Sequence, residues 1–395
     1  MNNFDFYSPT KILFGLDRES ETGEQIAAFG GSRVLVVYGG KSAEKSGLIK
    51  RIEDSLSNAG LEYKLLGGVQ PNPRLKLVRE GIEISKKFNA DFLLGVGGGS
   101  AIDTAKAIAV GAANPDTDIW DIWTRKASFD KVLPIGAVLT ISAAGSELSD
   151  SAVLTDWDTK TKRGLNSDMI RPKIAIMNPL LTSTLPKYQL TCGIVDIMMH
   201  TMDRYFNPVT DNELTDALAE ALLRTTITCG LELMKNPSDI HCLSEIMWAG
   251  SLSHNNLTGL GGTKDFTTHQ LGHELSGKFD VAHGASLSTM WPSFARYAVD
   301  ANPARFGQFG RNVLGLDDSG KAEKDFALES IQATEDFFRK LDMPTCFSEL
   351  GIGVLSEEEL DDLADRCVWH GKRTVGFFKV LDKDDVTAIY KMANH

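Results

Sequence analysis

The sequence lacks the features that mark secreted, membrane-spanning and nucleic-acid-binding proteins. It has five cysteines, an odd number, and no Cys-x-x-Cys pair, so we expect reduced thiols and an intracellular, cytoplasmic protein rather than a disulfide framework or a thiolate metal site. It has no apolar run of about eighteen residues and no basic start followed by an apolar stretch, so we expect neither a membrane span nor a secretory signal. A net charge of −12 argues against nucleic acid or anionic membrane as a partner.

What remains is the composition of a globular protein. The chain has 395 residues, of which 42% are hydrophobic and 24% charged. That length is sufficient for two or three domains with a large core.

The first part of the chain alternates between predicted strands and predicted helices. Short apolar runs bounded by glycine or proline predict buried parallel strands at 33–38, 91–96, 134–140 and 173–177. Helical segments are expected near 21–29, 43–59, 75–89 and 100–112, with another strand near 62–66 and two short strands within 4–15. This alternation predicts an α/β domain whose parallel sheet carries helices on both faces.

The pattern changes after residue 180. From there to the end, long amphipathic segments dominate and β-branched runs are few. We therefore predict an α/β domain over 1–180 and an all-helical domain over 181–395.

A glycine-rich loop follows the predicted strand at 91–96. Glycines there allow the backbone to approach a phosphate, and the N-terminus of the next helix offers free amides. Ser100 is expected to cap that helix, and Asp103 and Lys106, one turn later, to contact a ligand or each other. The loop, which consists of Gly97, Gly98, Gly99 and Ser100, departs from the GxGxxG pattern. Phosphate binding is favoured; the alternative is that the glycines only make a tight turn between strand and helix.

A second glycine-containing turn follows the predicted strand at 33–38. In dinucleotide-binding sheets, a carboxylate near such a strand end binds the ribose diol and repels a 2′-phosphate. Here the turn contains Gly39, Gly40 and Ser42, and no carboxylate occurs before Glu44. The turn therefore favours NADPH over NADH.

Histidines and one aspartate occur at helical spacing in the second part of the chain. His269 and His273 are four residues apart, as are Asp196 and His200, so each pair lies on one helix face. A helix stop at Gly277 would let the chain fold back and bring His283 near His269. Three imidazoles and a carboxylate suffice to bind a divalent transition metal.

Two other interpretations of these histidines must be considered: ordinary buried side chains and a zinc protease. A single histidine on an apolar helix face is usually a satisfied, partly buried side chain, but two separate pairs favour a metal site. The segment from His269 to His273 also resembles the zinc-protease helix, but Gln270 replaces the glutamate that would act as general base. A protease is therefore not expected.

Together these motifs resemble the iron-containing (group III) alcohol dehydrogenases, and among them the butanol dehydrogenase branch of NAD(P)H-dependent aldehyde reductases. The resemblance covers nearly the whole chain. It is carried by the segments Gly97–Lys106, Gly145-Ser146-Glu147, Gly193–His200, His269–His273 and His283-Gly284. It implies a Rossmann-like dinucleotide-binding domain, an all-helical domain, a dehydroquinate synthase-like architecture and a catalytic metal in the cleft between the domains.

The resemblance also implies roles for individual residues. The family's metal ligands match Asp196, His200, His269 and His283, while His273 matches a histidine beside the metal that is not a ligand and is expected to pass a proton to solvent. The expected cofactor-binding residues are Gly39, Gly40, Ser42, Gly97, Gly98, Gly99, Ser100, Asp103, Thr140, Ser142 and Lys162. Asn178 departs from the family, which usually has aspartate there.

The implied chemistry is hydride transfer between a nicotinamide and a primary alcohol or aldehyde such as butanol or butanal. A divalent ion would bind the alcohol oxygen and lower its pKa, or polarise the aldehyde carbonyl. The metal is expected to be Fe²⁺, with Zn²⁺ as the alternative, and the protein a homodimer. Candidate aromatic residues for a substrate lining are Trp120, Trp123, Phe266 and Trp369. The alternatives are a polyol dehydrogenase, a non-redox dehydroquinate synthase-like enzyme and a non-catalytic dinucleotide-binding protein.

Overall fold

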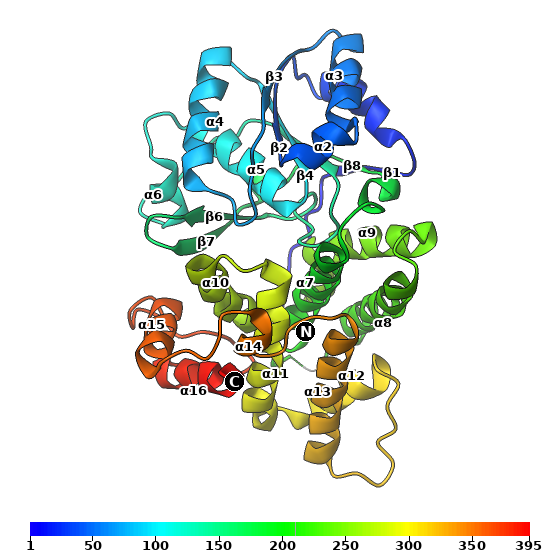
Figure 1. Cartoon of the computed structure of the whole chain (residues 1–395), viewed down its shortest axis with the longest axis vertical. Helices are drawn as coiled ribbons and strands as arrows, with labels where there is room; N and C mark the ends of the chain where they lie inside the picture. Colours follow the sequence, from blue (N-terminus) through cyan, green and yellow to red (C-terminus); the bar gives the residue numbers. More distant parts are fainter. Residues whose placement is uncertain (210) are drawn as a thin grey trace. The chain divides into compact units, whose positions relative to one another are not determined.

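The computed structural model describes residues 1–209 and 211–395, apart from the side chain of Lys41 (Figure 1). The chain forms two compact units. One, the α/β unit, is Tyr7–Leu185; the other, the helical unit, is Pro186–His395 together with Met1–Phe6. The first six residues thus belong to the helical unit, in which the amide of Asn2 donates to the carbonyl of Gly261.

The α/β unit is built on a six-stranded parallel sheet, as predicted. Its strand order is β1 (Lys11–Phe14), β8 (Ile174–Met177), β5 (Ile135–Leu139), β4 (Phe92–Gly97), β2 (Arg33–Tyr38) and β3 (Glu62–Leu66). Alternate residues of β2 enter different cores, Leu35 and Val37 on one face and Val34 and Val36 on the other. Both faces of the sheet are therefore covered, which explains the uninterrupted apolar runs.

Helices supply the cover on each face. The helical segments of this unit are η1 (Arg18–Glu21), α1 (Thr22–Ala28), α2 (Lys41–Lys45), α3 (Leu48–Asn58), α4 (Leu75–Phe88), α5 (Gly99–Ala113), α6 (Ile119–Trp123), η2 (Asp168–Ile170) and η3 (Pro179–Thr182). Residues of α4 and α5 share one core with Leu35, and residues of α1 and α3 share the other with Val34.

Two local predictions near the start of the chain were wrong or incomplete, and one hairpin was missed. Within 4–15 only β1 is a strand, because only Lys11–Phe14 pairs with β8, while Phe4, Phe6 and Tyr7 are exposed. The helix expected over 43–59 is two helices, because Gly47 adopts a left-handed φ of 73° between α2 and α3. An antiparallel hairpin of β6 (Ser151–Asp156) and β7 (Thr161–Asn166) was not anticipated.

The helical unit has no strands among its described residues. Its elements are α7 (Lys187–Tyr205), α8 (Glu213–Lys235), α9 (Ile240–His254), η4 (Leu257–Gly259), α10 (Thr267–Phe279), α11 (His283–Ala298), η5 (Val299–Ala301), α12 (Pro303–Asn312), α13 (Glu323–Lys340), α14 (Phe347–Leu350), α15 (Glu357–Cys367) and α16 (Lys383–Ala393). They enclose a single large apolar core. Almost every residue of α7 from Leu190 to Tyr205 is buried, so this helix runs through the middle of the unit.

Helices α10 and α11 pack closely against α7. A Cβ on Gly284 would lie 2.1 Å from the carbonyl oxygen of Cys192, so glycine is required where the first turn of α11 meets α7. Helix α10 continues through Gly277 and ends where Asp280 adopts a left-handed φ of 58°, so the predicted stop at Gly277 is wrong. The chain nevertheless folds back, since the rings of His269 and His283 lie 5.3 Å apart.

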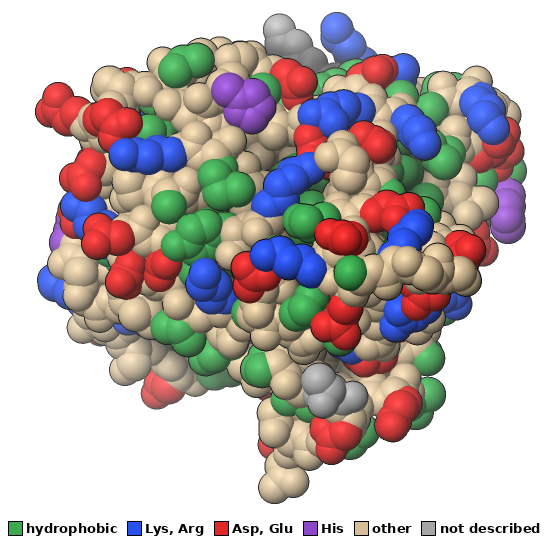
Figure 2. All heavy atoms as spheres, turned by 90° about the horizontal axis from the view of Figure 1, so that it is seen from below, with side chains coloured by type: hydrophobic (Ala, Val, Ile, Leu, Met, Phe, Trp, Pro, Cys, Tyr) green, Lys and Arg blue, Asp and Glu red, His purple; other side chains and the backbone are tan. Residues whose placement is uncertain are grey.

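No helix of the described residues is long and apolar enough to span a bilayer. On the face drawn in Figure 2, acidic and basic side chains are interspersed, and apolar side chains occur singly or in small groups.

Candidate functional site

The candidate metal centre begins on α7. Asp196 and His200 lie one turn apart and are both buried. The Nδ1 of His200 lies 2.9 Å from the backbone carbonyl oxygen of Asp196. A carbonyl only accepts, so Nδ1 carries the proton and the lone pair lies on Nε2.

Helices α10 and α11 bring further imidazoles to the same point. The Nε2 atoms of His269 and His283 lie 3.6 and 3.7 Å from Oδ1 of Asp196. One ligand atom from each of Asp196, His200 and His269 lies within 4.8 Å of the others. Side chains from three helices, two of them distant in sequence from the first, therefore converge on a single carboxylate oxygen.

The residues present fit a divalent cation. Oδ1 of Asp196 and Nε2 of His269 are buried and have no hydrogen-bond partner among the described residues. Leaving a buried carboxylate oxygen and an imidazole nitrogen unsatisfied is costly, and a metal ion satisfies both at once. Nitrogen and oxygen donors suit Fe²⁺, Zn²⁺ and Co²⁺ alike.

Burial and neighbouring charge set the protonation of these imidazoles. The pKa of His200 is well below its ordinary value because the ring is buried, with His269 and the Arg204 guanidinium nearby. Burial alone would lower the pKa of His269, but its interactions with Asp196 and Asp203 outweigh burial and raise the pKa. Asp203 lies on α7, and its Oδ2 is 2.6 Å from Nδ1 of His269.

His273 and His254 lie in the same neighbourhood. The half-buried ring of His273 is 5.2 Å from the ring of His283 and 6.3 Å from that of His269. His254, at the end of α9, packs edge-on against His200 at 4.0 Å. Sequence reasoning missed His254 because no partner lies four residues away. It also missed Asp203, although its position seven residues after Asp196 puts both on one face of α7.

One of the four aromatic candidates lies beside the metal centre. The Phe266 ring is 5.1 Å from the His269 ring and 6.2 Å from the His200 ring. Trp123 is instead part of the α/β unit's core, and Trp120 packs against that core. Trp369 is half-buried, under the guanidinium of Arg373 at 4.2 Å.

The predicted dinucleotide loops follow three adjacent parallel strands. The turn of Gly39, Gly40 and Ser42 follows β2, the glycine-rich loop follows β4, and Thr140 and Ser142 follow β5. Because the strands are parallel, these segments lie at the same edge of the sheet. The carboxyl-terminal edge is where open α/β sheets bind ligands.

Packing also requires glycines in the loop after β4. Gly97 has a φ of 153°, and a Cβ there would lie 2.7 Å from the Cβ of Ala101. A Cβ on Gly98 would lie 2.9 Å from the Cβ of Ile141. Gly98 is the N-cap of α5, so the prediction that Ser100 caps the helix was wrong, because the helix already begins at Gly99.

Asp103 and Lys106 both contact the first strand of the hairpin, β6, and the segment just before it. The Asp103 carboxylate accepts from the Ser146 hydroxyl and from the Val153 amide, while Nζ of Lys106 donates to the carbonyls of Ser149 and Ser151. Burial raises the pKa of Asp103 and lowers the pKa of Lys106 to about 8. Both side chains thus hold the segment from Ser146 to Val153 in place from within the α/β unit.

Two further predicted cofactor residues, Ser142 and Lys162, are buried. Oγ of Ser142 is buried and has no hydrogen-bond partner among the described residues, and Lys162 is buried with its Nζ 3.1 Å from Oδ1 of Asn72. Asn178 donates from Nδ2 to the buried carboxylate of Glu19, at 2.9 Å. Asparagine fits there because an aspartate would face a second carboxylate.

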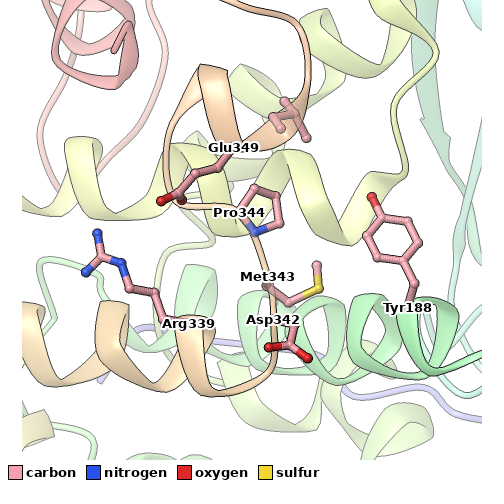
Figure 3. A pocket seen from close by; sticks show the side chains of 7 residues that line it. Tyr188, Arg339, Asp342, Met343, Pro344 and Glu349 are labelled. Carbon is pink, nitrogen blue, oxygen red and sulfur yellow. The ribbon is translucent and has the colours of Figure 1, made fainter.

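A pocket of about 320 Å³ lies in the helical unit, and its lining includes none of the predicted site residues (Figure 3). It is lined by Tyr188, Arg339, Asp342, Met343, Pro344, Glu349 and Leu350. Its charged groups are engaged locally: Glu349 accepts from the amide and hydroxyl of Thr345, and Arg339 donates to Glu335 and to Thr345.

Comparison with known proteins identifies the family. Residues 9–179 match the model "Iron-containing alcohol dehydrogenase", and residues 191–394 match the model of the C-terminal part of the Fe-containing alcohol dehydrogenase family. The chain is 38% identical over 391 residues, 99% of each chain, to the probable NADH-dependent butanol dehydrogenase 1 of Bacillus subtilis. It is 33% identical over 395 residues, the full length of both chains, to the NADPH-dependent aldehyde reductase YqhD of Escherichia coli.

A solved structure is also similar to this chain over its whole length. The crystal structure of NADH-dependent butanol dehydrogenase A from Thermotoga maritima superposes with a TM-score of 0.95 at 35% identity, covering 100% of this chain and 99% of that chain. The predicted family resemblance and fold class are therefore confirmed. The chain belongs to the iron-containing alcohol dehydrogenase family and is an NAD(P)-dependent oxidoreductase that interconverts alcohols and aldehydes.

Proposed function

We propose that this enzyme reduces short, unbranched aldehydes such as butanal to primary alcohols, and catalyses the reverse oxidation, with Asp196, His200, His269 and His283 as its metal ligands. The observation that carries the proposal is the convergence of Nε2 of His269 and Nε2 of His283 on the buried Oδ1 of Asp196. The named substrates of the relatives, butanol and aldehydes, support the substrate class.

The ligand set determines what a bound ion contributes. A divalent ion held there acts as a Lewis acid towards an alcohol or carbonyl oxygen. Asp196 brings one negative charge, and three neutral imidazoles leave the remaining positive charge uncompensated. The proposed ion is Fe²⁺, in accord with the family, and Zn²⁺ is the alternative.

His273 is the proposed proton carrier. Its half-buried ring lies next to the proposed ligands, 5.2 Å from the ring of His283 and 6.3 Å from the ring of His269. An imidazole in this position can accept a proton from the alcohol and release it to solvent.

The dinucleotide is proposed to bind at the carboxyl ends of β2, β4 and β5. Gly97, Gly98, Gly99 and Ser100 would hold its pyrophosphate at the N-terminus of α5. Gly39, Gly40, Ser42, Thr140, Ser142 and Lys162 would contact the rest of it. Asp103 would act through Ser146 and Val153, to which it is bonded. NADPH is the favoured form, and both cofactors occur in the names of relatives.

An aldehyde panel followed at 340 nm with NADPH and NADH, together with elemental analysis of the purified protein, tests this proposal. We expect about one equivalent of iron or zinc, turnover of butanal, and loss of turnover after chelation. A protein that reduces butanal at full rate without bound metal would contradict the ligand assignment. A preference for 1,3-propanediol over butanol would support the diol alternative, because 1,3-propanediol dehydrogenases are 29% identical relatives.

We further propose a cytoplasmic homodimer. Exposed Phe4, Phe6 and Tyr7 precede β1, which is an edge strand with one side open to pairing. The five cysteines form no disulfide in the structure, which is consistent with a reducing compartment. Light scattering on the purified protein checks the dimer: a mass near 43.1 kDa, that of one chain, would contradict it.

A further inference from the structure

We propose that Asp203 is a positioning residue of the metal centre, which holds His269 in the orientation and tautomer needed for metal binding. The inference rests on the proposed function, because it assumes that His269 is a ligand. Asp203 is buried on α7, on the same helix face as Asp196 and two turns after it.

The bond between Asp203 and His269 determines which imidazole nitrogen is available. Oδ2 of Asp203 lies 2.6 Å from Nδ1 of His269. An ionised carboxylate only accepts, so Nδ1 carries the proton. The lone pair therefore lies on Nε2, which is 3.6 Å from Oδ1 of Asp196. A carboxylate that holds the far nitrogen of a metal-binding histidine also makes the ligand more basic.

Asp203 also compensates for a missing cap at the start of α10. The N-cap residue is Phe266, which has no side-chain acceptor and a left-handed φ of 55°. The backbone amide of His269, one of the orphan donors of that first turn, points to Oδ2 of Asp203 at 3.4 Å. The backbone carbonyl of Asp203 accepts from the amide of Asp265, at 3.0 Å. One residue of α7 therefore fixes both the start of α10 and the His269 ring.

Phe266 limits the remaining freedom of that ring. Its left-handed backbone conformation directs the phenyl group to within 5.1 Å of the His269 ring, and the Arg204 guanidinium lies 4.7 Å from the phenyl centroid. The imidazole is thus held by a hydrogen bond along one edge and an aromatic contact beside it.

Asp265 offers a matched control because it stabilises the same helix start without touching His269. Its Oδ1 accepts from the Thr267 amide, and its Oδ2 accepts from the amides of Phe377 and Phe378. Replacing Asp203 or Asp265 with asparagine removes one buried carboxylate beside α10 in each case, but only the first change alters the partner of the His269 imidazole.

The experiment compares wild-type protein, Asp203→Asn and Asp265→Asn as full-length chains. Each is stripped of metal, refilled with Co²⁺ and titrated against a competing chelator, with thermal unfolding followed in parallel. We expect Asp203→Asn to weaken Co²⁺ binding by about 10- to 100-fold and to shift the visible Co²⁺ absorption bands. Asp265→Asn should lower the melting temperature but bind Co²⁺ as tightly as the wild type. Asp203→Glu, which keeps the carboxylate, should recover part of the lost affinity.

Each outcome is decisive. Equal Co²⁺ affinity in Asp203→Asn and wild type, or equal losses in both asparagine variants, would overturn the positioning role. If Asp203→Asn does not fold, Asp203→Ser replaces it, since a serine hydroxyl is too short to reach Nδ1 and the same loss is expected. A wild-type protein that binds no divalent metal would refute the proposed function itself, which distinguishes that failure from failure of the positioning role alone.

Discussion

The helical unit and the α/β unit build their candidate sites from different parts of the chain. The helical unit brings together ionisable side chains: Asp196, His200, His269 and His283 converge, and Asp203 contacts His269. The α/β unit presents turns at the carboxyl ends of β2, β4 and β5, and in the turn after β4 the glycines let the backbone lie close to Ala101 and Ile141. One site thus depends on specific side chains, whereas the other depends largely on the absence of side chains.

This difference predicts how each site responds to substitution. Removing a donor from the helical unit removes a ligand and leaves other buried polar atoms unsatisfied. Adding atoms to the glycine loop of the α/β unit causes crowding, whereas Lys106 holds the segment that contains Ser149 and Ser151. Substitutions in the two units should therefore separate metal content from dinucleotide binding.

The largest effect should come from His269→Ala. Loss of a ligand should abolish bound metal and reduce turnover by about a thousandfold or more, because several kcal/mol of charge stabilisation disappear. His273→Ala is the matched change one helical turn later. It should retain metal but slow turnover by about a hundredfold. Elemental analysis and steady-state kinetics measure both variants. Full metal and full rate in His269→Ala would remove this residue from the ligand set.

Lys106→Met should have the next largest effect, on the pH dependence of stability. Burial lowers the pKa of Lys106 to about 8, against an ordinary value of 10.5. Below pH 8 the amine is charged in both states and the folded state bears the full cost of burial. As pH rises from about 8 to 10.5 the folded protein loses its proton first, so the contribution of Lys106 to stability rises, by about 3 kcal/mol in total.

Urea unfolding between pH 7 and pH 10.5 checks this expectation. The free energy of unfolding of wild type relative to Lys106→Met should increase across that range. Parallel curves for the two proteins would show that the lysine's pKa is the same folded and unfolded. Metal content should be unchanged in the variant, because Lys106 lies in the α/β unit.

The smallest effect is expected for two glycine substitutions, Gly98→Ala and Gly40→Ala, which should differ in their effect on stability. Both glycines have ordinary, extended backbone angles, with φ and ψ of −84° and −169° at Gly98 and −81° and −162° at Gly40. A Cβ at Gly98 meets Ile141 at 2.9 Å, whereas a Cβ at Gly40 has nothing within 4 Å. Gly98→Ala should therefore cost about 1–3 kcal/mol of stability and raise the KM for the dinucleotide.

Gly40→Ala should leave the melting temperature unchanged. A rise in its KM for the dinucleotide without loss of stability would indicate that the backbone at this turn approaches the ligand. Equal melting temperatures for both variants would show that the turn at Gly98 relaxes around the extra methyl group.

Much of the fold was predictable because its signals are local. The strands 33–38 and 173–177 were predicted from short apolar runs alone, since a strand covered on both faces needs no polar alternation. The hairpin of β6 and β7 was missed. Its first strand includes polar residues such as Ser151 and Thr155, and it is stabilised by contacts from α5 that no local pattern reveals.

The site was predictable to the extent that it follows helical spacing. Asp196 with His200 and His269 with His273 were recognised from pairs four residues apart. His283 was predicted from the expected return of the chain after this helix and from the resemblance to the family. His254 and Asp203 were missed as site residues, because their relation to His200 and His269 exists only once α9, α7 and α10 have packed.

The sequence by itself determined the family, the alternation that makes a parallel sheet, and the donors available for a metal, because each depends on residue type and short-range spacing. Only the tertiary structure decided that Nε2 of His269 faces Asp196, that Asp203 holds the opposite nitrogen, and that Asp103 and Lys106 support a loop. The longest of these relations joins His269 to Asp196, and that between His269 and Asp203 spans 66 positions. Which polar atoms satisfy one another across such a separation is decided by packing and burial, and no local pattern in the chain encodes it.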